Sequence, residues 1–258
     1  MNLRSQLQPD SARHDASQAL PGQADENADQ SLLASDAGGE FAMIRDGYHI
    51  RCSNGFTGLQ PHITALIERM YQTRGLHVYH PELEHTEFQT TIAACRGDHF
   101  FATLTLGLDS PTGLMADTLY HPEIEAARQS GGRVCEVTRM AMDPEHNSAE
   151  VMADLFQMVY VLARLIYRKT DLFIEVHPRH AGFYRRMLGY RVVGEERICP
   201  RVGAPAILMH MSQHEVDELL AEHAGKAAAA TRSLYRLFAP PAQMLALQKQ
   251  LTQQLLRR

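Results

Sequence analysis

Apolar residues recur along the middle of the chain with two different periods, and each period predicts one kind of element. Short alternating or continuous apolar runs, bounded by Gly, Pro, Asn or Asp, are typical of strands. Such runs occur at residues 43–52, 88–95, 99–106, 133–142, 171–176, 190–193 and 204–211. Residues 63–71 and 149–169 instead place apolar side chains three and four positions apart, which predicts two amphipathic helices.

Capping and turn residues mark the boundaries of these elements. Gly75 ends the first helix, Ser148 supplies the N-cap of the long one, and Gly189 ends a short helix over residues 180–188. Gly97-Asp98 lies between two strands and predicts a tight hairpin. The order of elements predicts an α/β fold with a mixed central sheet, flanking helices and a strand–helix–strand crossover near the middle.

The two ends of the chain differ from this middle region. Residues 1–40 are rich in Gln, Asp, Ser, Ala and Gly, which predicts a disordered tail before a folded domain at residues 41–212. Residues 213–258 are helical in pattern, and one helix face carries Met244, Leu247, Leu251 and Leu255. We expect this helical C-terminal extension to bury that narrow stripe within the chain or in a homodimer, rather than by peripheral contact with a membrane.

Composition and charge exclude several classes of protein. The 258 residues carry a net charge of −5, which does not suggest a nucleic-acid partner. The four cysteines are widely spaced and predict neither a zinc site nor a disulfide scaffold. The sequence lacks a secretion signal and any apolar run of the roughly 18 residues that a membrane span needs. A cytoplasmic location is therefore expected.

Three segments resemble known enzymes. They read GFYRRMLGY at residues 182–190, CEVTR at 135–139 and LDSPTGLMAD at 108–117. The first resembles the aromatic helix after the fifth strand of the GNAT superfamily. The second is similar to the Glu-x-Ser-Arg strand of acyl-homoserine-lactone synthases, with Thr138 in place of serine. With the third segment they most resemble the N-acyl amino acid synthases, over about residues 43–211. The resemblance implies a GNAT fold, a thioester acyl donor and an amine acceptor.

The strand at residues 133–142 carries the candidate chemistry. Aminolysis of a thioester needs a neutral amine, so Glu136 is the candidate base and Arg139 the candidate partner of the acceptor's carboxylate. Thr138 keeps the hydroxyl of the related motif and is a further substrate-binding candidate. The alternative is an internal Glu136–Arg139 ion pair that only stabilises the strand. Three positions apart, the two side chains would point to opposite faces of a regular strand, and the resemblance implies a β-bulge that brings them together.

Tyr184 and His177 lie in the segment after the next strand. By resemblance, Tyr184 is the candidate acid that protonates the departing thiolate, and a tyrosine that only packs under the sheet is equally open. His177 and His180 have the spacing of a metal pair, but Pro178 separates them and no carboxylate cluster is nearby. We therefore expect no metal, and we expect His177 to form a polar wall of the substrate cleft.

The donor follows from a loop that differs from other GNAT enzymes. Acetyl-CoA-dependent members hold the pyrophosphate with a Gly-containing loop before the long helix, whereas residues 143–150 contain no glycine and carry Asp143, Glu145 and Glu150. The donor is therefore expected to be acyl-phosphopantetheine on an acyl carrier protein, with no bound cofactor. Carrier proteins are acidic. The basic residues of the short helix, Arg179, Arg185 and Arg186, are candidates for docking the carrier, although a merely solvated basic face is as consistent with the sequence.

Two other functions stay open at this point. An acyl-homoserine-lactone-type synthase would use S-adenosylmethionine as its acceptor. A non-catalytic GNAT-like module would bind a lipid or a carrier without acyl transfer, although Glu136, Arg139 and Tyr184 argue against it. The sequence names neither the amino acid that is acylated nor the length of the acyl chain.

Overall fold

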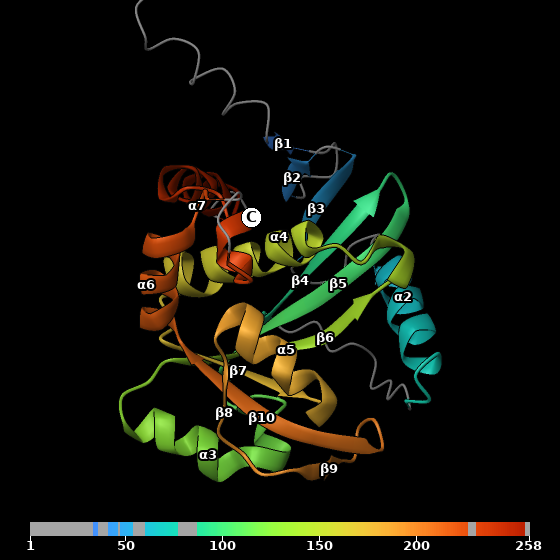
Figure 1. Cartoon of the computed structure of the whole chain (residues 1–258), viewed down its shortest axis with the longest axis vertical. Coiled ribbons are helices and arrows are strands. Elements are labelled where there is room, and N and C mark those ends of the chain that lie inside the picture. Colours follow the sequence, from blue (N-terminus) through green and yellow to red (C-terminus); the bar gives the residue numbers. More distant parts are fainter. Residues whose placement is uncertain are drawn as a thin grey trace, which may run out of the picture.

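A computed structural model describes residues 33–35, 41–45, 47–53, 60–76, 87–226 and 231–255, so most of the predicted N-terminal tail lies outside the described residues. The described strands form one mixed sheet in the order β1-β2-β3-β4-β5-β6-β7-β10-β8, with β9 paired to β10 (Figure 1). The strands are β1 Leu33–Ser35, β2 Phe41–Arg45, β3 Tyr48–Ser53, β4 Gln89–Arg96, β5 His99–Leu108, β6 Val134–Met142, β7 Asp171–Val176, β8 Arg191–Val192, β9 Arg197–Cys199 and β10 Ala204–Ser212. The predicted mixed α/β sheet is confirmed.

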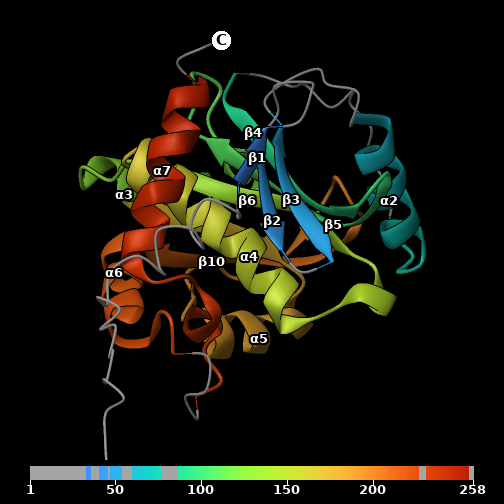
Figure 2. The same cartoon turned by 90° about the horizontal axis from the view of Figure 1, so that it is seen from above.

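Helices cover both faces of this sheet. They are α2 Gln60–Gln72, α3 Asp117–Gln129, η1 Pro144–His146, α4 Ala149–Tyr160, η2 Val161–Ile166, α5 Pro178–Leu188, α6 Gln213–His223, η3 Leu234–Leu237 and α7 Pro241–Leu255. Figures 1 and 2 show α4 lying across the sheet with α5, α6 and α7 beside it. Helices α2 and α3 pack on the opposite face, each over its own small apolar cluster. The molecule therefore has three layers.

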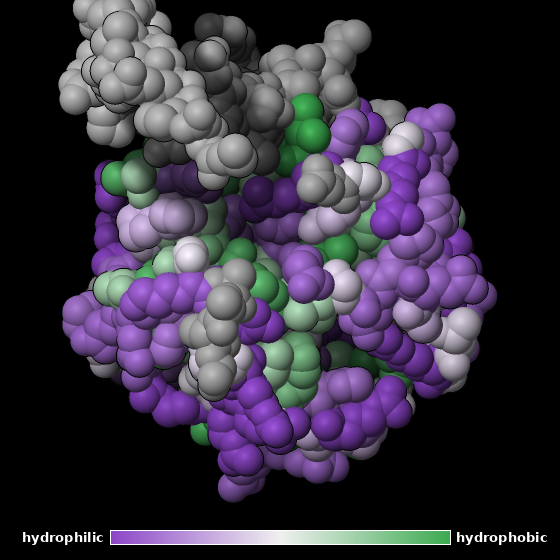
Figure 3. Space-filling view, turned by 45° about the horizontal axis from the view of Figure 1, so that its top comes forward, coloured by the Kyte–Doolittle hydropathy of each residue, from purple (hydrophilic) through white to green (hydrophobic). Residues whose placement is uncertain are grey.

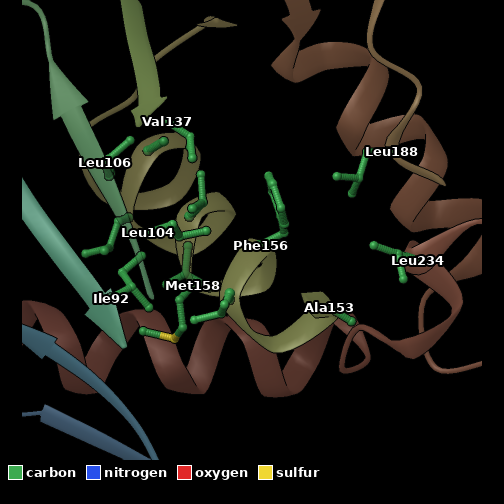
Figure 4. Close-up of a cluster of buried hydrophobic side chains, with 14 of the residues drawn as sticks. Ile92, Leu104, Leu106, Val137, Ala153, Phe156, Met158, Leu188 and Leu234 are labelled. Carbon is green, nitrogen blue, oxygen red and sulfur yellow. The ribbon is translucent and has the colours of Figure 1, made fainter. Parts of the chain in front are cut away.

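The main core lies between the sheet and α4. Ile92, Leu104, Leu106 and Val137 project from β4, β5 and β6 toward Phe156 and Met158 of the helix, with Leu188 and Leu234 nearby (Figure 4). Neighbouring positions on the same strands face the other way, as Ala93 does toward α2. This alternation is the reason why continuous apolar runs in the sequence become strands that are buried on both faces. The surface is largely hydrophilic in the view of Figure 3, with hydrophobic residues gathered toward its hollowed middle.

The crossover from β6 through α4 to β7 produces the only parallel pair among the described strands. Ser148 caps α4 as predicted, because its hydroxyl accepts a hydrogen bond from the Val151 amide at 3.1 Å. The long helix continues beyond Tyr160 as the π-helical turn η2 and ends at Ile166, three residues earlier than the sequence suggested.

One predicted strand was wrong, and two short strands were not predicted. Residues 43–52 are not one strand, because Arg45 pairs with Tyr48 and the chain reverses between β2 and β3. Gly47 has a φ of +80°, which this tight hairpin requires. The sequence also gave no sign of β9, a short strand next to β10. In the segment assigned to the tail, Leu33–Ser35 pairs with β2 as β1.

The helices after residue 212 pack on the rest of the same chain. Met244, Leu247 and Leu251 of α7 belong to the main core, together with Leu234 and Phe238 of the η3 segment. The Gln248 side chain donates to the Leu165 carbonyl at 3.0 Å, and the buried Gln157 side chain accepts from the Ala239 amide at 2.6 Å. The described part of the apolar stripe is thus buried within the chain. Among the described residues, no helix is both long enough and apolar enough to cross a bilayer.

Candidate active site

The pocket that the candidate residues share lies where β6 and β7 separate. The two strands pair only as far as Val137 and Ile174, and beyond that point a cavity of about 240 Å³ opens between their carboxyl ends. Its walls come from both strands, from α2, α4 and α5, and from the segment between β9 and β10. Ligands of open α/β sheets bind at this kind of position, beyond the carboxyl ends of parallel strands.

A β-bulge shapes the β6 wall of this pocket, as the resemblance implied. The pairing of β6 with β5 shifts between Thr138 and Ala141, where two residues of β6 face one residue of β5. Arg139 lies in this bulge with a φ of +52°, a left-handed conformation that is uncommon for a residue with a side chain. The bulge ends the regular alternation of β6 and leaves Thr138, Arg139 and Met140 all lining the pocket.

The bulge brings Arg139 to the sheet face that carries Glu136. Arg139 Nη1 donates to Gln89 Oε1 at 3.0 Å. Gln89 pairs with Gly107, and Gly107 pairs with Glu136, so these positions share one face of the sheet. No ion pair joins Glu136 to Arg139, so the internal pair weighed above is not present. Burial lowers the pKa of Arg139, which has no carboxylate partner among the described residues.

Glu136 is only 3% exposed and lies behind the pocket wall rather than in it. Its Oε1 accepts from the Met115 amide at 2.6 Å, and its Oε2 accepts from the Ala116 amide at 3.1 Å. Burial raises the pKa of Glu136 to about 7, and the two amide hydrogen bonds oppose that rise. Gly107 leaves room for this side chain, because a Cβ there would lie 3.1 Å from Glu136 Cγ. The carboxyl group can therefore exchange a proton near neutral pH.

Sequence reasoning missed the polar group that closes the pocket on the β7 side. Arg201, from the turn after β9, pairs with Glu175 of β7 at 2.5 Å and donates to the Met115 carbonyl at 3.0 Å. Cys199 lines the same wall. Burial, and to a smaller extent a hydrogen bond with Glu175, raises the pKa of its thiol. Glu175 lies two residues after Phe173, so the strand period of residues 171–176 places both side chains on one face of the sheet and could have indicated Glu175. An arginine in a turn, such as Arg201, has no comparable pattern around it.

Tyr184 lies in the pocket wall opposite the bulge. Its hydroxyl donates to the Met140 sulfur at 3.2 Å, and burial raises the pKa of Tyr184 to about 12. A thioether is a weak acceptor, so this proton could be offered to a stronger acceptor in the pocket. The Tyr184 side chain thus lines the same pocket as the bulge residues.

His177 lines the pocket and also begins α5. Its Nδ1 accepts from the Arg179 amide at 3.2 Å, which makes His177 the N-cap of the helix. His180 Nε2 accepts from Arg179 Nε at 3.1 Å, so it is not arranged with His177 around a shared ligand. Burial and the Arg179 charge lower the pKa of His180. Within the described ranges, no group of three or more His, Cys, Asp and Glu side chains could hold a metal ion.

The loop before α4 is occupied by internal contacts. Asp143 accepts from the Glu145 amide at 3.0 Å and pairs with Arg69 of α2 at 2.9 Å, so its charge is already matched. Glu145 and Glu150 are exposed near the helix start. Exposed basic side chains lie on and beside α5: Arg179, Arg185 and Arg186. Two other arginines are neutralised by ion pairs, Arg164 by Asp217 and Arg191 by Glu215.

These features together define a class of enzyme. A mixed sheet that opens around a pocket at its parallel pair, with a bulge on one strand and an aromatic helix after the other, is the architecture of a GNAT-type acyltransferase. The family model of FeeM, described as an N-acyl amino acid synthase, matches residues 62–212. The chain therefore belongs to the FeeM family of N-acyl amino acid synthases, and it is an acyltransferase.

Several solved structures are similar to this chain, and the first of them is a member of the same family. The structure of FeeM, an N-acyl amino acid synthase from uncultured soil microbes, aligns with this chain at 25% sequence identity and a TM-score of 0.59. The alignment covers 65% of this chain and 92% of the FeeM chain. A putative N-acetyltransferase from Lactobacillus plantarum is 16% identical, covering 65% of this chain and 99% of its own, with a TM-score of 0.49. An acyl-CoA N-acyltransferase from Pseudomonas aeruginosa is 14% identical, covering 62% and 97%, with a TM-score of 0.47. None of the curated proteins matches the chain.

Proposed function

We propose that this enzyme transfers a long-chain acyl group from an acyl carrier protein in the cytoplasm to the α-amine of an amino acid. The observation that carries the choice of acceptor is Arg139, a half-buried guanidinium in the pocket wall without a carboxylate partner in the described structure. A buried cation is costly unless it is paired, and the α-carboxylate of an amino acid would supply that pair. The apolar remainder of the pocket, with Phe156, Ile174 and Val176, suits an acyl chain.

The residues around the bulge account for each step of the transfer. The amine nitrogen attacks the thioester carbon, and Glu136 accepts the amine proton through a water, because its carboxylate lies behind the pocket surface. A backbone N–H freed by the bulge at Arg139 donates to the tetrahedral oxyanion. The C–S bond then breaks, and Tyr184 gives its proton to the departing thiolate. Thr138 and His177 contribute polar contacts to the bound substrates.

The choice of donor is tested by comparing thioesters. Because residues 143–150 contain no glycine and present acidic side chains at the start of α4, a pyrophosphate finds no cradle there. We expect long-chain acyl carrier protein to give a higher kcat/KM than acetyl-CoA with the purified enzyme and a panel of amino acids. A higher kcat/KM for acetyl-CoA would contradict this choice of donor. Turnover with S-adenosylmethionine, and not with amino acids, would contradict the choice of acceptor.

The same assay separates the carrier from its pantetheine arm. Arg185 and Arg186 are exposed and have no ion-pair partner in the described part of the chain, so they are free to meet an acidic carrier. Glu substitutions at both positions should raise KM for acyl carrier protein and leave KM for the matching acyl-pantetheine unchanged. An equal increase in KM for both donors would show that Arg185 and Arg186 do not dock the carrier.

Arg139 gives the second test of the acceptor. We expect Arg139→Gln to raise KM for the amino acid roughly 10-fold or more, the scale of a lost charge-assisted hydrogen bond. The amide of the same amino acid lacks the carboxylate, so its KM should be high for the wild type and unaffected by the substitution. The control is Arg133→Gln, which changes an exposed arginine just before β6. If Arg139→Gln raised KM for both acceptors equally, Arg139 would not be the carboxylate site.

A further inference from the structure

The turn that holds Glu136 is itself fixed by a network of charges outside the pocket. Arg128, in the last turn of α3, forms hydrogen bonds with Asp109 at 2.8 and 3.0 Å and with Asp117 at 2.5 and 2.9 Å. Asp109 follows β5, and Asp117 is the first residue of α3. One guanidinium therefore ties the end of a strand to the start of a helix, across the turn between them.

Asp117 passes this constraint to the backbone of the turn. Its Oδ2 accepts from the Leu114 amide at 2.7 Å, and the next two amides, of Met115 and Ala116, are those that hold Glu136. The turn is close-packed at this point, since a Cβ on Gly113 would lie 2.6 Å from Asp117 Oδ2 and Gly113 has a φ of +80°. Although burial alone would raise it, the hydrogen bonds from Arg128 and the Leu114 amide lower the pKa of Asp117.

We infer that Arg128 is a positioning residue for the acyl transfer, which acts by holding the Met115 and Ala116 amides against the Glu136 carboxylate. This inference rests on the proposed role of Glu136 as the base. Arg128 does not line the pocket, and its side-chain hydrogen bonds go to Asp109, Asp117 and Glu125. Its effect must therefore pass through the turn.

The charged groups that face Glu136 from its other neighbours do not pair with Arg128. Arg201 and Glu175 act on it from the β9–β10 turn and β7, and Arg139 and Cys135 act on it from β6. From β5, Gly107 contributes only space. A change at Arg128 should thus alter the amide hydrogen bonds of Glu136 and leave these charges unaltered.

The test is the pH dependence of kcat for Arg128→Gln. A loosened turn donates less well to the carboxylate, which raises the pKa of Glu136 and moves the rising limb of the profile to higher pH. With a shift of about one pH unit from a starting pKa of about 7, activity falls about fivefold at pH 7 and recovers to within twofold at pH 9. Arg133→Gln, with its exposed side chain, serves as the control and should keep the wild-type profile.

Two further variants keep the outcome decisive. Asp109→Asn removes one of the three carboxylates bound by Arg128 and should give a smaller shift in the same direction, even if Arg128→Gln does not fold. Glu136→Gln separates the two proposals. If it is inactive while Arg128→Gln and Asp109→Asn keep the wild-type profile, the role of Arg128 is overturned and the base assignment stands. If Glu136→Gln keeps full activity, the base assignment itself fails.

Discussion

Glu136→Gln lowers kcat by roughly 10²-fold or more, the low end of the effect of a general base. The substitution keeps the shape of the side chain and removes its ability to accept a proton. Because the pKa of Glu136 is about 7, wild-type activity should rise with pH through that value, and the variant should lose this rise. Steady-state kinetics with one donor and one acceptor between pH 6 and pH 9 measure both effects.

The stability of this variant distinguishes catalysis from structure. A carboxyl group whose pKa is raised on folding binds more protons in the folded state, so its contribution to stability falls as pH rises from its ordinary pKa of 4.5 to about 7. Gln avoids that cost above pH 7, but it leaves one of the two turn amides without its acceptor. These effects oppose each other, so we expect little change in Tm at pH 8. A variant that melts early but stays active would show that Glu136 is structural.

The fold was predictable where a local signal and the tertiary environment agree. Gly97 between two apolar runs, Ser148 before an amphipathic run and Gly189 after a short helix each have a local physical reason, and the structure confirms all three. The hairpin at Gly47 shows the opposite case, because the apolar pattern of residues 43–52 continued through the turn and concealed it. Periodicity alone cannot separate one strand from two that share a register.

The site was predictable along β6 and much less across the molecule. Glu136, Thr138 and Arg139 stand within four residues of one another, and the structure places all three in or directly behind one pocket wall. Gln89, which is 50 residues from its partner Arg139, and Arg201 complete their surroundings and have no local signal in the sequence. Amide donors such as Met115 are invisible to any reading of side chains, because any residue type could supply them. The roles of these residues remain proposals that the variants above test.

Truncation after Ser212 should leave a chain that is insoluble or unfolded at room temperature. The removed segments contribute these buried side chains to the main core: Val216, Leu220, Leu234, Tyr235, Phe238, Met244, Leu247 and Leu251. Burial of one such side chain stabilises a protein by about 1.5–3 kcal/mol, and the total stability of a domain is only about 5–15 kcal/mol. The Tyr235 hydroxyl also donates to the Leu188 carbonyl at the end of α5. The truncation removes this hydrogen bond and so weakens the attachment of the helix that carries Tyr184.

Two leucines of α7 show whether the stripe stabilises the fold or serves another surface. Leu247 is 5% exposed and packs in the core, whereas Leu245 on the same helix is 50% exposed. Leu247→Ala should cost about 2–5 kcal/mol, and Leu245→Ala should change stability by less than about 0.5 kcal/mol. Thermal melting of both variants measures the difference directly. If the truncated chain and Leu247→Ala both melted like the wild type, the stripe would not support the core. Loss of liposome binding by the truncated chain would then identify the extension as a membrane anchor, because burial in the fold predicts no such binding.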